Sequence, residues 1–449
     1  MSDSYLIKPV LNREYPVVTH GKGIYLYDTK GKEYIDGSSG AVTASIGHSV
    51  KEITEAMKEQ ADKVSFVYRS QFSTEAAEKL AKKLKELSPG ELNWSFFVNS
   101  GSEATETAMK IAIQYWQEKR QHEKTKIISR WMSYHGITMG ALSMSGHLSR
   151  RERFEMTLQK YPAISAPYYY RDANGKTIEQ CDEAYAAELE KEILKIGADR
   201  IAAFIAEPII GAAGGAITPS ATYFQKMKLL CDKYNILFIA DEVMTGAGRT
   251  GKMFAMEHFR VVPDIMATGK GLSAGYTPIA ATVVSDRVMD PILNGSNSIM
   301  SGHTFSANPQ SAAVAVAVLN YIEKNKLVEN AAQKGSYLRE KLERIAEASE
   351  IIGDVRGKGL LIGIEFVKNK RSKQPFPRKV NLVNKVVNAN FAEGLLVYPA
   401  NAGKRGIDGD AVIIAPPLTI TKGEADELIR RFKRGLDKTE KALAGEVIL

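Results

Sequence analysis

The stretch DIMATGKGLSAGYTPIAA, residues 264–281, places one lysine, Lys270, between two glycines shortly after an apolar run. The run DIMA predicts a β-strand that ends just before this lysine, and IAATVV, residues 279–284, predicts the next strand. Most lysines in loops are solvated and have no further role. A lysine with room around it, in an apolar setting of small residues, is instead a candidate to react with a bound ligand.

Short apolar runs of the same kind recur upstream, each followed by a turn with a glycine or an acid and then by a helical stretch. They are SFFV (95–98), KIIS (126–129), IAAFIA (201–206) and ILFIA (236–240). This alternation predicts an α/β fold with a mostly parallel sheet and helices on both of its faces. Ligands in such folds gather at the carboxyl ends of the strands.

Three more strand ends carry notable residues. SFFV is followed by NSGSE, residues 99–103, at the start of a helix, where free N–H groups suit a phosphate. An ordinary N-cap by Ser100 or Ser102 would give the same pattern. IAAFIA is followed by Glu207, and ILFIA by Asp241, each of which is either a helix cap or a buried acid that faces a cation. A Schiff-base lysine, an anion and a phosphate turn are together what pyridoxal phosphate requires.

The later part of the chain has a different pattern. Two helical stretches, one ending near residue 324 and one near residue 349, precede three apolar runs that predict strands: GLLIGIEFV (359–367), LLVYP (395–399) and AVIIA (411–415). Near the start, IYLYD and EYID flank a turn and predict a β-hairpin. We expect the hairpin and the carboxyl-terminal α+β part to form a second, smaller domain.

In order and spacing, the motifs closely resemble those of the class III pyridoxal-phosphate aminotransferases, the ω-aminotransferase group. They are NSGSEATETAMKIA (99–112), YHG (134–136), AEP (206–208), DEVMTGAGRTG (241–251), TGKGLSAGYTPIAA (268–281) and GHTFSANP (302–309). The resemblance covers nearly the whole chain. It implies the α/β fold of the fold-type I transferases, with a large mostly parallel-sheet domain (61–324) and a small domain made of both chain ends (1–60 and 325–449).

The resemblance also implies catalytic and phosphate-binding residues. Lys270 would form the Schiff base with the cofactor and then move the proton between the substrate carbon and the cofactor. Asp241 would keep the pyridine nitrogen protonated, so that the ring can accept electrons. Gly101 and Ser102 would bind the phosphate, with a weaker contribution from Ser100.

Four further cofactor contacts follow from the same resemblance. Thr304 would reach the phosphate in the partner subunit of a homodimer. Tyr134 would cover one face of the cofactor ring and Val243 the other, while Glu207 would support the cofactor or its surroundings. Plain packing remains an alternative for Tyr134 and Val243, as does a helix cap for Thr304.

The substrate pocket is less defined by the sequence. Arg405 lies near the stretch that carries a mobile, carboxylate-binding arginine in many relatives, and Arg69 lies in a segment that often lines the neighbouring subunit's site. A solvated Arg405 or an interface salt bridge by Arg69 remains an open alternative. Val42 and the polar pair Arg69-Ser70 stand where some relatives have bulky aromatic residues, so we expect a roomier or more polar pocket.

We therefore expect an enzyme, a homodimer or tetramer with shared active sites. It would transfer the amino group of an ω-amino acid or diamine to pyruvate or 2-oxoglutarate by a ping-pong mechanism. Another reaction of the same superfamily, as in an aminomutase, a racemase or a decarboxylase, is the first alternative. A non-catalytic binding protein that kept the fold is the second, and the joint presence of Lys270, Asp241 and the phosphate turn argues against it.

The composition of the chain argues against nucleic acid, metal ions and membranes as partners. The 449 residues include 60 Lys plus Arg and 52 Asp plus Glu, which gives a net charge of +8. The densest basic cluster, residues 150–153, predicts a solvated or ion-paired surface rather than a nucleic-acid site. His48, His135 and His303 lack metal-ligand spacing, so we expect no metal. Two cysteines, no signal-peptide pattern and no long apolar segment predict a cytoplasmic protein with no membrane role.

Overall fold

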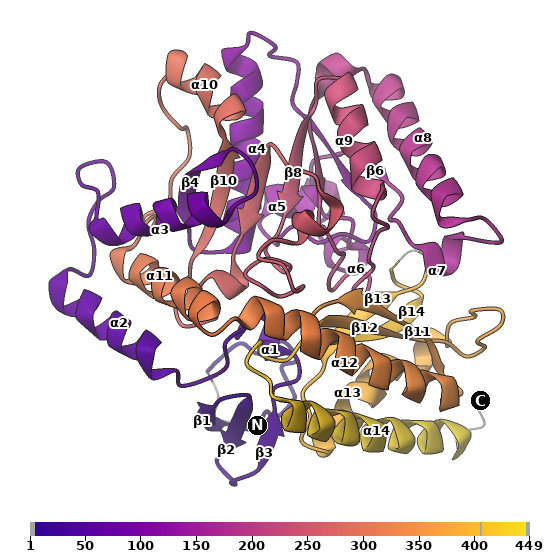
Figure 1. Cartoon of the computed structure of the whole chain (residues 1–449). Helices are drawn as coiled ribbons and strands as arrows, with labels where there is room; N and C mark the ends of the chain where they lie inside the picture. Colours follow the sequence, from indigo (N-terminus) through magenta and orange to yellow (C-terminus); the bar gives the residue numbers. More distant parts are fainter. Residues whose placement is uncertain (1–4, 405, 446–449) are drawn as a thin grey trace.

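The structure is a computed structural model that describes residues 5–404 and 406–445 (Figure 1). Its centre is a seven-stranded sheet. From edge to edge the strands are β4 (Leu92–Val98), β10 (Ala280–Ser285), β9 (Ile265–Thr268), β8 (Leu237–Asp241), β7 (Ile201–Ala206), β5 (Lys126–Arg130) and β6 (Ala163–Ile164). Strand β10 runs antiparallel to β4 and β9, and all other neighbours pair in parallel. The predicted mostly parallel sheet is confirmed.

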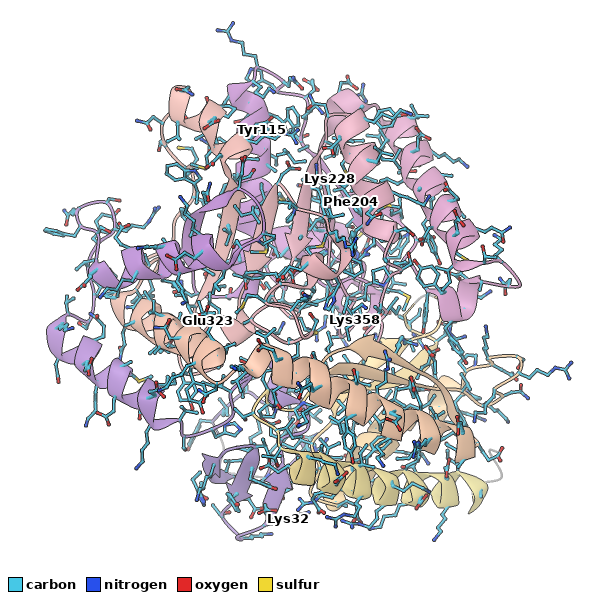
Figure 2. All side chains as sticks on the ribbon, in the orientation of Figure 1. Lys32, Tyr115, Phe204, Lys228, Glu323 and Lys358 are labelled. Atoms are coloured by element: carbon cyan, nitrogen blue, oxygen red, sulfur yellow. The ribbon has the colours of Figure 1, made fainter. Side chains whose placement is uncertain are left out.

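Helices cover both faces of this sheet, also as predicted. One face is covered by α4 (Gly101–Glu118) and α10 (Asp286–Asn294). The other is covered by α8 (Ile178–Ile196), α9 (Tyr223–Lys233), α3 (Glu75–Leu87) and α11 (Pro309–Lys324). Side chains fill the space between the layers, as Figure 2 shows for Phe204, which is fully buried between β7 and the α8–α9 layer. Because both faces are covered, the central strands are continuously apolar.

A second, four-stranded antiparallel sheet lies among the carboxyl-terminal helices (Figure 1). Its strands, in order, are β11 (Ile352–Lys358), β12 (Leu361–Phe366), β14 (Gly409–Ile414) and β13 (Tyr398–Ala402). The helices that pack around it are α12 (Leu327–Ala348), α13 (Leu382–Ala392) and α14 (Lys422–Gly445). The remaining α-helices are α1 (Ser39–Val42), α2 (Lys51–Lys63), α5 (Met139–Met144), α6 (Leu148–Arg151) and α7 (Tyr169–Asp172).

The two ends of the chain share one core. The predicted hairpin is present as β2 (Tyr25–Asp28) and β3 (Glu33–Ile35), and β1 (Val18–Lys22) extends it. The Ile35 N–H donates to the Gly394 carbonyl at 2.8 Å, and the Ile35 carbonyl accepts from the Leu396 N–H at 2.9 Å. These contacts support a small domain built from both ends, and its bounds at residues 60 and 325 remain a prediction.

Three strands, β1, β6 and β11, have no counterpart among the predicted runs. Strand β11 reads IGDVRGK, which has neither a continuous apolar run nor a strict alternation. It forms because its backbone pairs along β12, from Ile352 to Lys358. Strand pairing of this kind depends on the neighbouring strand more than on local propensity.

A buried ionic cluster ties the small sheet to the large one. Glu365 of β12 accepts hydrogen bonds from Arg356 of β11 at 2.6 Å and from Arg171 of α7 at 2.7 Å. Arg356 also donates to the carbonyls of Gly214 and Gly215, in the loop that follows β7. The small sheet is thereby fixed against a loop that leaves the carboxyl edge of the large sheet.

None of the helices within residues 5–404 and 406–445 combines the length and the apolar content that crossing a bilayer requires.

Candidate active site

Five parallel strands of the large sheet end around one pocket of about 160 Å³. Residues from the ends of β4, β5, β7, β8 and β9 line it, which is the position expected for a ligand site in an open α/β sheet. The lining residues are Gly101, Ser102, Tyr134, His135, Gly136, Glu207, Ala212, Asp241, Val243, Met244 and Lys270. The carboxyl edge therefore brings together residues that are up to 169 positions apart, since 270 − 101 = 169.

Lys270 lies in a one-turn 3₁₀ helix, Lys270–Leu272, directly after β9. Its backbone has φ of +41°, in the left-handed region that non-glycine residues seldom adopt. Burial lowers the pKa of its amine, and the carboxylates of Asp241 and Glu207 only partly oppose this shift. A lysine with a lowered pKa is more available as a nucleophile and base near neutral pH, because a larger fraction of its amine is uncharged.

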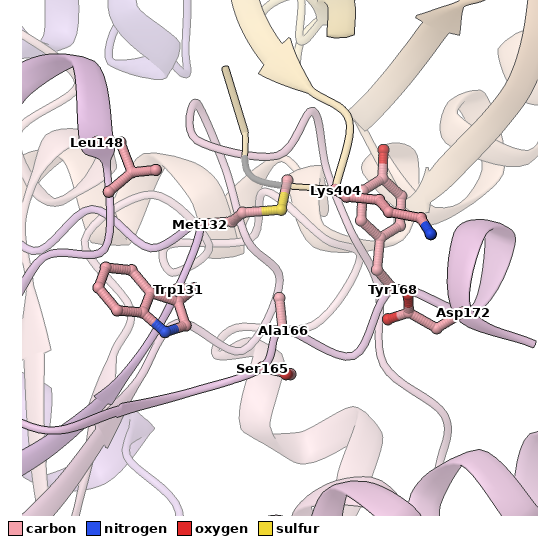
Figure 3. Close-up of a pocket in the computed structure, with 8 residues that line it drawn as sticks. All are labelled: Trp131, Met132, Leu148, Ser165, Ala166, Tyr168, Asp172 and Lys404. Carbon is pink, nitrogen blue, oxygen red and sulfur yellow. The ribbon is translucent and has the colours of Figure 1, made fainter. Parts of the chain in front are cut away.

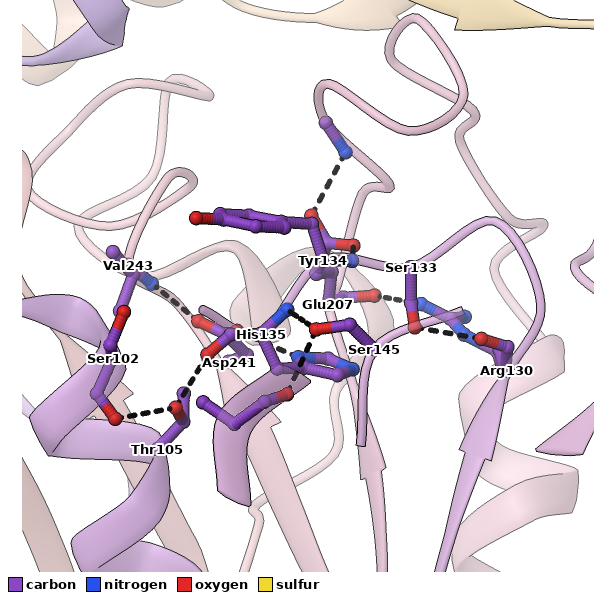
Figure 4. A network of polar contacts seen from close by, with 12 residues as sticks. Ser102, Thr105, Arg130, Ser133, Tyr134, His135, Ser145, Glu207, Asp241 and Val243 are labelled. Atoms are coloured by element: carbon purple, nitrogen blue, oxygen red, sulfur yellow. Dashed lines mark hydrogen bonds and ion pairs between the residues drawn. The ribbon is translucent and has the colours of Figure 1, made fainter. Parts of the chain in front are cut away.

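Asp241 is the last residue of β8 and is almost completely buried. Its Oδ2 lies 2.8 Å from His135 Nδ1, and its Oδ1 accepts from the Val243 N–H at 3.1 Å (Figure 4). The ring nitrogen of His135 is the donor, because an ionised carboxylate can only accept. These two bonds hold the carboxylate in one orientation at the floor of the pocket.

Glu207 joins two backbone segments of the pocket wall through hydrogen bonds. Its Oε1 accepts from the Tyr134 N–H at 2.9 Å, and its Oε2 accepts from the Gly211 N–H at 3.0 Å (Figure 4). Burial raises the pKa of the Glu207 carboxyl, and the charge of Asp241 adds to that effect, while His135 opposes it. Glu207 thus fixes the backbone that carries Tyr134 at the rim.

The turn between β4 and α4 forms the opposite wall. Ser100 is the N-cap of α4 and accepts from the Glu103 N–H, so the N–H groups of Gly101 and Ser102 are among those with no intrahelical carbonyl. A Cβ atom on Gly101 would lie 2.7 Å from Val243 Cγ1, and one on Gly136 would lie 2.6 Å from Ser102 Oγ. Only glycine allows these backbones to approach so closely. The result is a narrow cup of N–H donors suited to an anion.

Comparison with known proteins identifies the family. Residues 10–436 match the family model of the class III aminotransferases. The chain belongs to this family. It is 56% identical over 440 residues to an uncharacterized aminotransferase, YodT, of Bacillus subtilis, covering 98% of this chain and 99% of the relative. It is 34% identical to a putrescine–pyruvate aminotransferase of Pseudomonas aeruginosa, covering 95% of this chain and 91% of that one.

A solved structure extends the match to three dimensions. The ω-transaminase of Pseudomonas jessenii, determined in complex with PMP, superimposes with a TM-score of 0.91 at 36% identity, covering 96% of this chain and 94% of that one. The aminotransferase described here is accordingly a pyridoxal-phosphate-dependent enzyme that transfers an amino group between an amine and a 2-oxo acid. Its fold is the predicted one of the pyridoxal-phosphate transferases.

The residues present in this aminotransferase fit the cofactor. The amine of Lys270, the fixed carboxylate of Asp241 and the N–H cup at Gly101 and Ser102 line one pocket, and these are the three groups that the cofactor needs. Among the described residues, no group of three or more His, Cys, Asp or Glu is placed to hold a metal ion. The pocket thus matches an organic phosphate with a cationic ring.

Seven of the predicted cofactor residues line this pocket together: Gly101, Ser102, Tyr134, Glu207, Asp241, Val243 and Lys270. The other two do not. Ser100 is exposed and serves as the helix N-cap, which was the alternative considered from the sequence. Thr304 is exposed and does not line the pocket of its own chain, which is compatible with a residue that serves a partner subunit. The roles of all nine remain predictions.

The three substrate candidates have different surroundings. Val42 is buried in a cluster that also contains Ala212 and Met244, two residues of the pocket lining. Arg69 does not line the pocket, and it donates to the Ser301 carbonyl at 2.6 Å. Arg405 lies outside the described residues.

Sequence reasoning missed the role of His135. From the sequence we expect His135 to be a structural histidine and not a metal ligand, whereas the structure places it beside the pocket carboxylate of Asp241. Its position directly after Tyr134 in the YHG motif was the available signal. Ala212 and Met244, which also line the pocket, have no chemical signature that a sequence pattern would reveal.

A larger cavity of about 480 Å³ lies off this site (Figure 3). It is lined by Trp131, Met132, Leu148, Ser165, Ala166, Tyr168, Asp172 and Lys404. None of these residues lines the cofactor pocket. Cavity size therefore does not identify the active site in this protein. The active site is identified by the reactive and charged side chains that meet in the smaller pocket.

Proposed function

We propose that this enzyme takes the amino group from an ω-amino acid or a diamine and gives it to pyruvate or 2-oxoglutarate. The two substrates use the site in turn, in a ping-pong sequence. The observation that carries the proposal is the partly buried Lys270 amine at strand ends that also hold Asp241 and the α4 cup. The donor class is supported by the similarity to a putrescine–pyruvate aminotransferase and to an ω-transaminase.

Pyridoxal phosphate, when bound, supplies a ring that accepts the electrons left after a proton leaves the substrate carbon. The Lys270 amine accepts that proton and returns it, because its lowered pKa keeps part of it uncharged. The carboxylate of Asp241, held by His135, stabilises the positive charge of a protonated ring nitrogen. Because the site is buried, the effective dielectric constant is lower than in water, and the interactions of the Lys270 amine and the Asp241 carboxylate are stronger.

The remaining pocket residues orient the cofactor in our proposal. The N–H groups of Gly101 and Ser102 bind the phosphate, and Tyr134 and Val243 hold the ring between them. Glu207 acts indirectly, since both of its carboxylate oxygens are used by backbone N–H groups of the wall. Val42, in place of a bulkier side chain, leaves room for the substrate.

We further propose a homodimer in which each active site takes Thr304 from the partner subunit. Exposed aromatic side chains support this: Phe66 is 41%, Tyr68 54% and Phe305 59% exposed. Phe66 and Phe305 pack edge to face at 6.0 Å, so the two segments that carry Arg69 and Thr304 lie together on the surface. Exposed apolar side chains that gather in this way are typical of protein interfaces. A cytoplasmic location also remains our prediction.

The substitution Lys270→Ala tests the proposed chemistry. We expect kcat for amine-to-pyruvate transfer to fall by at least about 10²–10⁴-fold, because the general base is removed. The visible absorbance of lysine-bound cofactor should disappear as well. Lys252→Ala, at an exposed lysine on the loop after β8, is the matched control and should retain both properties.

Product analysis of the wild-type enzyme separates the alternatives. Amino transfer requires one new 2-oxo acid or aldehyde for each amino acid formed. Release of carbon dioxide, or inversion of the donor with no new carbonyl product, would contradict the proposal. Unchanged turnover in Lys270→Ala would contradict it equally.

A further inference from the structure

Arg150, at the end of the short helix α6, stands at the rim of the cofactor pocket. Its guanidinium carbon lies 4.6 Å from the centroid of the Tyr134 ring, over the ring face. Tyr134 itself lines the cofactor pocket. The Arg150 side chain is exposed, so its charged end is accessible from solvent. A cation held on an aromatic face is restricted in orientation without being neutralised.

The same arginine lines a second cavity, of about 480 Å³, next to the cofactor pocket. Ala212 lines both, so the two spaces meet at this small side chain. Tyr398 and Ala400 of the small sheet form the far wall of the second cavity. A molecule that extends from Lys270 past Ala212 would enter this space.

The other charged side chains of the second cavity are already engaged. Arg378 donates to the Ile407 carbonyl at 2.9 Å. Asp410 accepts from the Val383 N–H at 3.3 Å, and burial raises the pKa of its carboxyl to about 6. Asp408 is not free either. Burial lowers the pKa of the His147 imidazole to about 4, so this side chain is neutral at pH 7.

Arg150 is different. Within residues 5–404 and 406–445, no carboxylate forms an ion pair with Arg150 and no acceptor takes its N–H groups. Its neighbour Arg151 shows the contrast, since it pairs with Glu155 at 3.2 Å and donates to the carbonyls of Leu142, Ser143 and Ser145. The predicted ion pairing of this basic cluster therefore holds for Arg151. It does not explain the position of Arg150 over the Tyr134 ring.

The contact with Tyr134 explains how Arg150 would select its ligand. The guanidinium is held over the Tyr134 ring, and its N–H groups form a planar fork, a geometry that matches a planar carboxylate.

We propose that Arg150 binds the carboxylate of the 2-oxo acid acceptor, and of the amino acid formed from it. This inference rests on the proposed function and names a specificity-determining residue for it. Amine donors without a carboxylate do not need Arg150. The two halves of the ping-pong reaction should therefore depend on Arg150 to different degrees.

Separate half-reactions of the holoenzyme test this. The first is reaction with a carboxylate-free amine, putrescine or 1-phenylethylamine, whichever the wild type uses faster. The second is reaction of the aminated enzyme with pyruvate or 2-oxoglutarate. Each is followed by the absorbance of the bound cofactor. For Arg150→Gln we expect the half-saturating concentration of the 2-oxo acid to rise by about ten- to hundredfold. The amine half-reaction should change less than about twofold.

Two further variants complete the test. Arg150→Lys keeps the charge without the planar fork and should recover part of the affinity for the 2-oxo acid. Arg153→Gln removes an exposed arginine three positions away that lines neither cavity, and it should behave as wild type. The inference is overturned if Arg150→Gln leaves 2-oxo acid saturation unchanged, or if it slows both half-reactions equally. Failure of the wild type to aminate any 2-oxo acid would instead overturn the proposed function.

Discussion

Lys270 combines an unusual backbone with an unusual charge state. A non-glycine residue in the left-handed region costs about 1–3 kcal/mol, and such strain persists where the surroundings fix the residue for function. Here the fixed surroundings are the end of β9 and the neighbouring Gly269 and Gly271. The sequence alone identified the lysine. Its lowered pKa results from burial, against the opposing effect of Asp241 and Glu207, and only the fold produces this burial and brings these carboxylates close.

The pKa of Lys270 predicts how cofactor binding responds to pH. An amine must be uncharged to react with the aldehyde of pyridoxal phosphate, so the rate of holoenzyme formation rises as pH passes the lysine pKa. Because that pKa is lowered, we expect the midpoint to lie well below the ordinary 10.5. The measurement is the rate of the absorbance change when cofactor is added to cofactor-free enzyme, from pH 6 to 11. A midpoint at or above 10.5 would rule out the lowered pKa.

Helix α4 shows how one element supports the site at its end. Its first turn supplies the N–H cup, and Gly101 sits so close to Val243 that the helix start and the turn after β8 form one wall. The sequence predicts this helix, and Ser100 is one of the two residues that it offers as the cap. The packing of Gly101 on Val243 joins residues 142 positions apart, since 243 − 101 = 142, and no local pattern reports it.

The substitution Gly101→Ala tests this wall. The added Cβ would lie 2.7 Å from Val243 Cγ1, and relieving the overlap must displace α4 or the turn. Overpacking of this kind costs about 1–3 kcal/mol, so we expect the Kd for pyridoxal phosphate to rise by about tenfold, measured by absorbance titration. Adding Val243→Ala removes the clashing atom and should recover part of the loss. Gly423→Ala, where an added Cβ meets nothing within 4 Å, is the control, and an equal effect there would refute the argument.

At the scale of the whole molecule, a buried ionic cluster joins the two sheets, and exposed segments form the proposed dimer interface. The buried cluster of Glu365, Arg356 and Arg171 fixes the small sheet to the large one, and losing one partner of such a cluster costs about 3–5 kcal/mol. The exposed Arg69 and Thr304 do not line the pocket of their own chain. In the proposed dimer, these segments complete the site of the other subunit.

Mixed dimers test that arrangement. Thr304→Glu places a negative charge where the proposal puts the partner's phosphate, and Lys270→Ala removes the reactive lysine, so each homodimer should be inactive. A mixed dimer, purified through two different tags, contains one site with both residues intact if Thr304 acts across the interface. We expect about half of the wild-type activity and a mass about twice the 49.4 kDa of one chain. An inactive mixed dimer of that mass would show that Thr304 does not act across the interface.

The sequence by itself determined the strands of the large sheet, apart from the two-residue β6, and the strand ends that carry the chemistry. Apolar runs, turns and helix starts are local patterns, and Lys270, Asp241 and the NSGSE turn each lie within such a pattern. It left open β11, which forms by pairing, and it assigned no role to Arg150 or to His135 beyond a structural one. The tertiary structure decided where both residues lie, because His135 meets Asp241 across 106 positions and Arg150 lies over the Tyr134 ring and lines the second cavity.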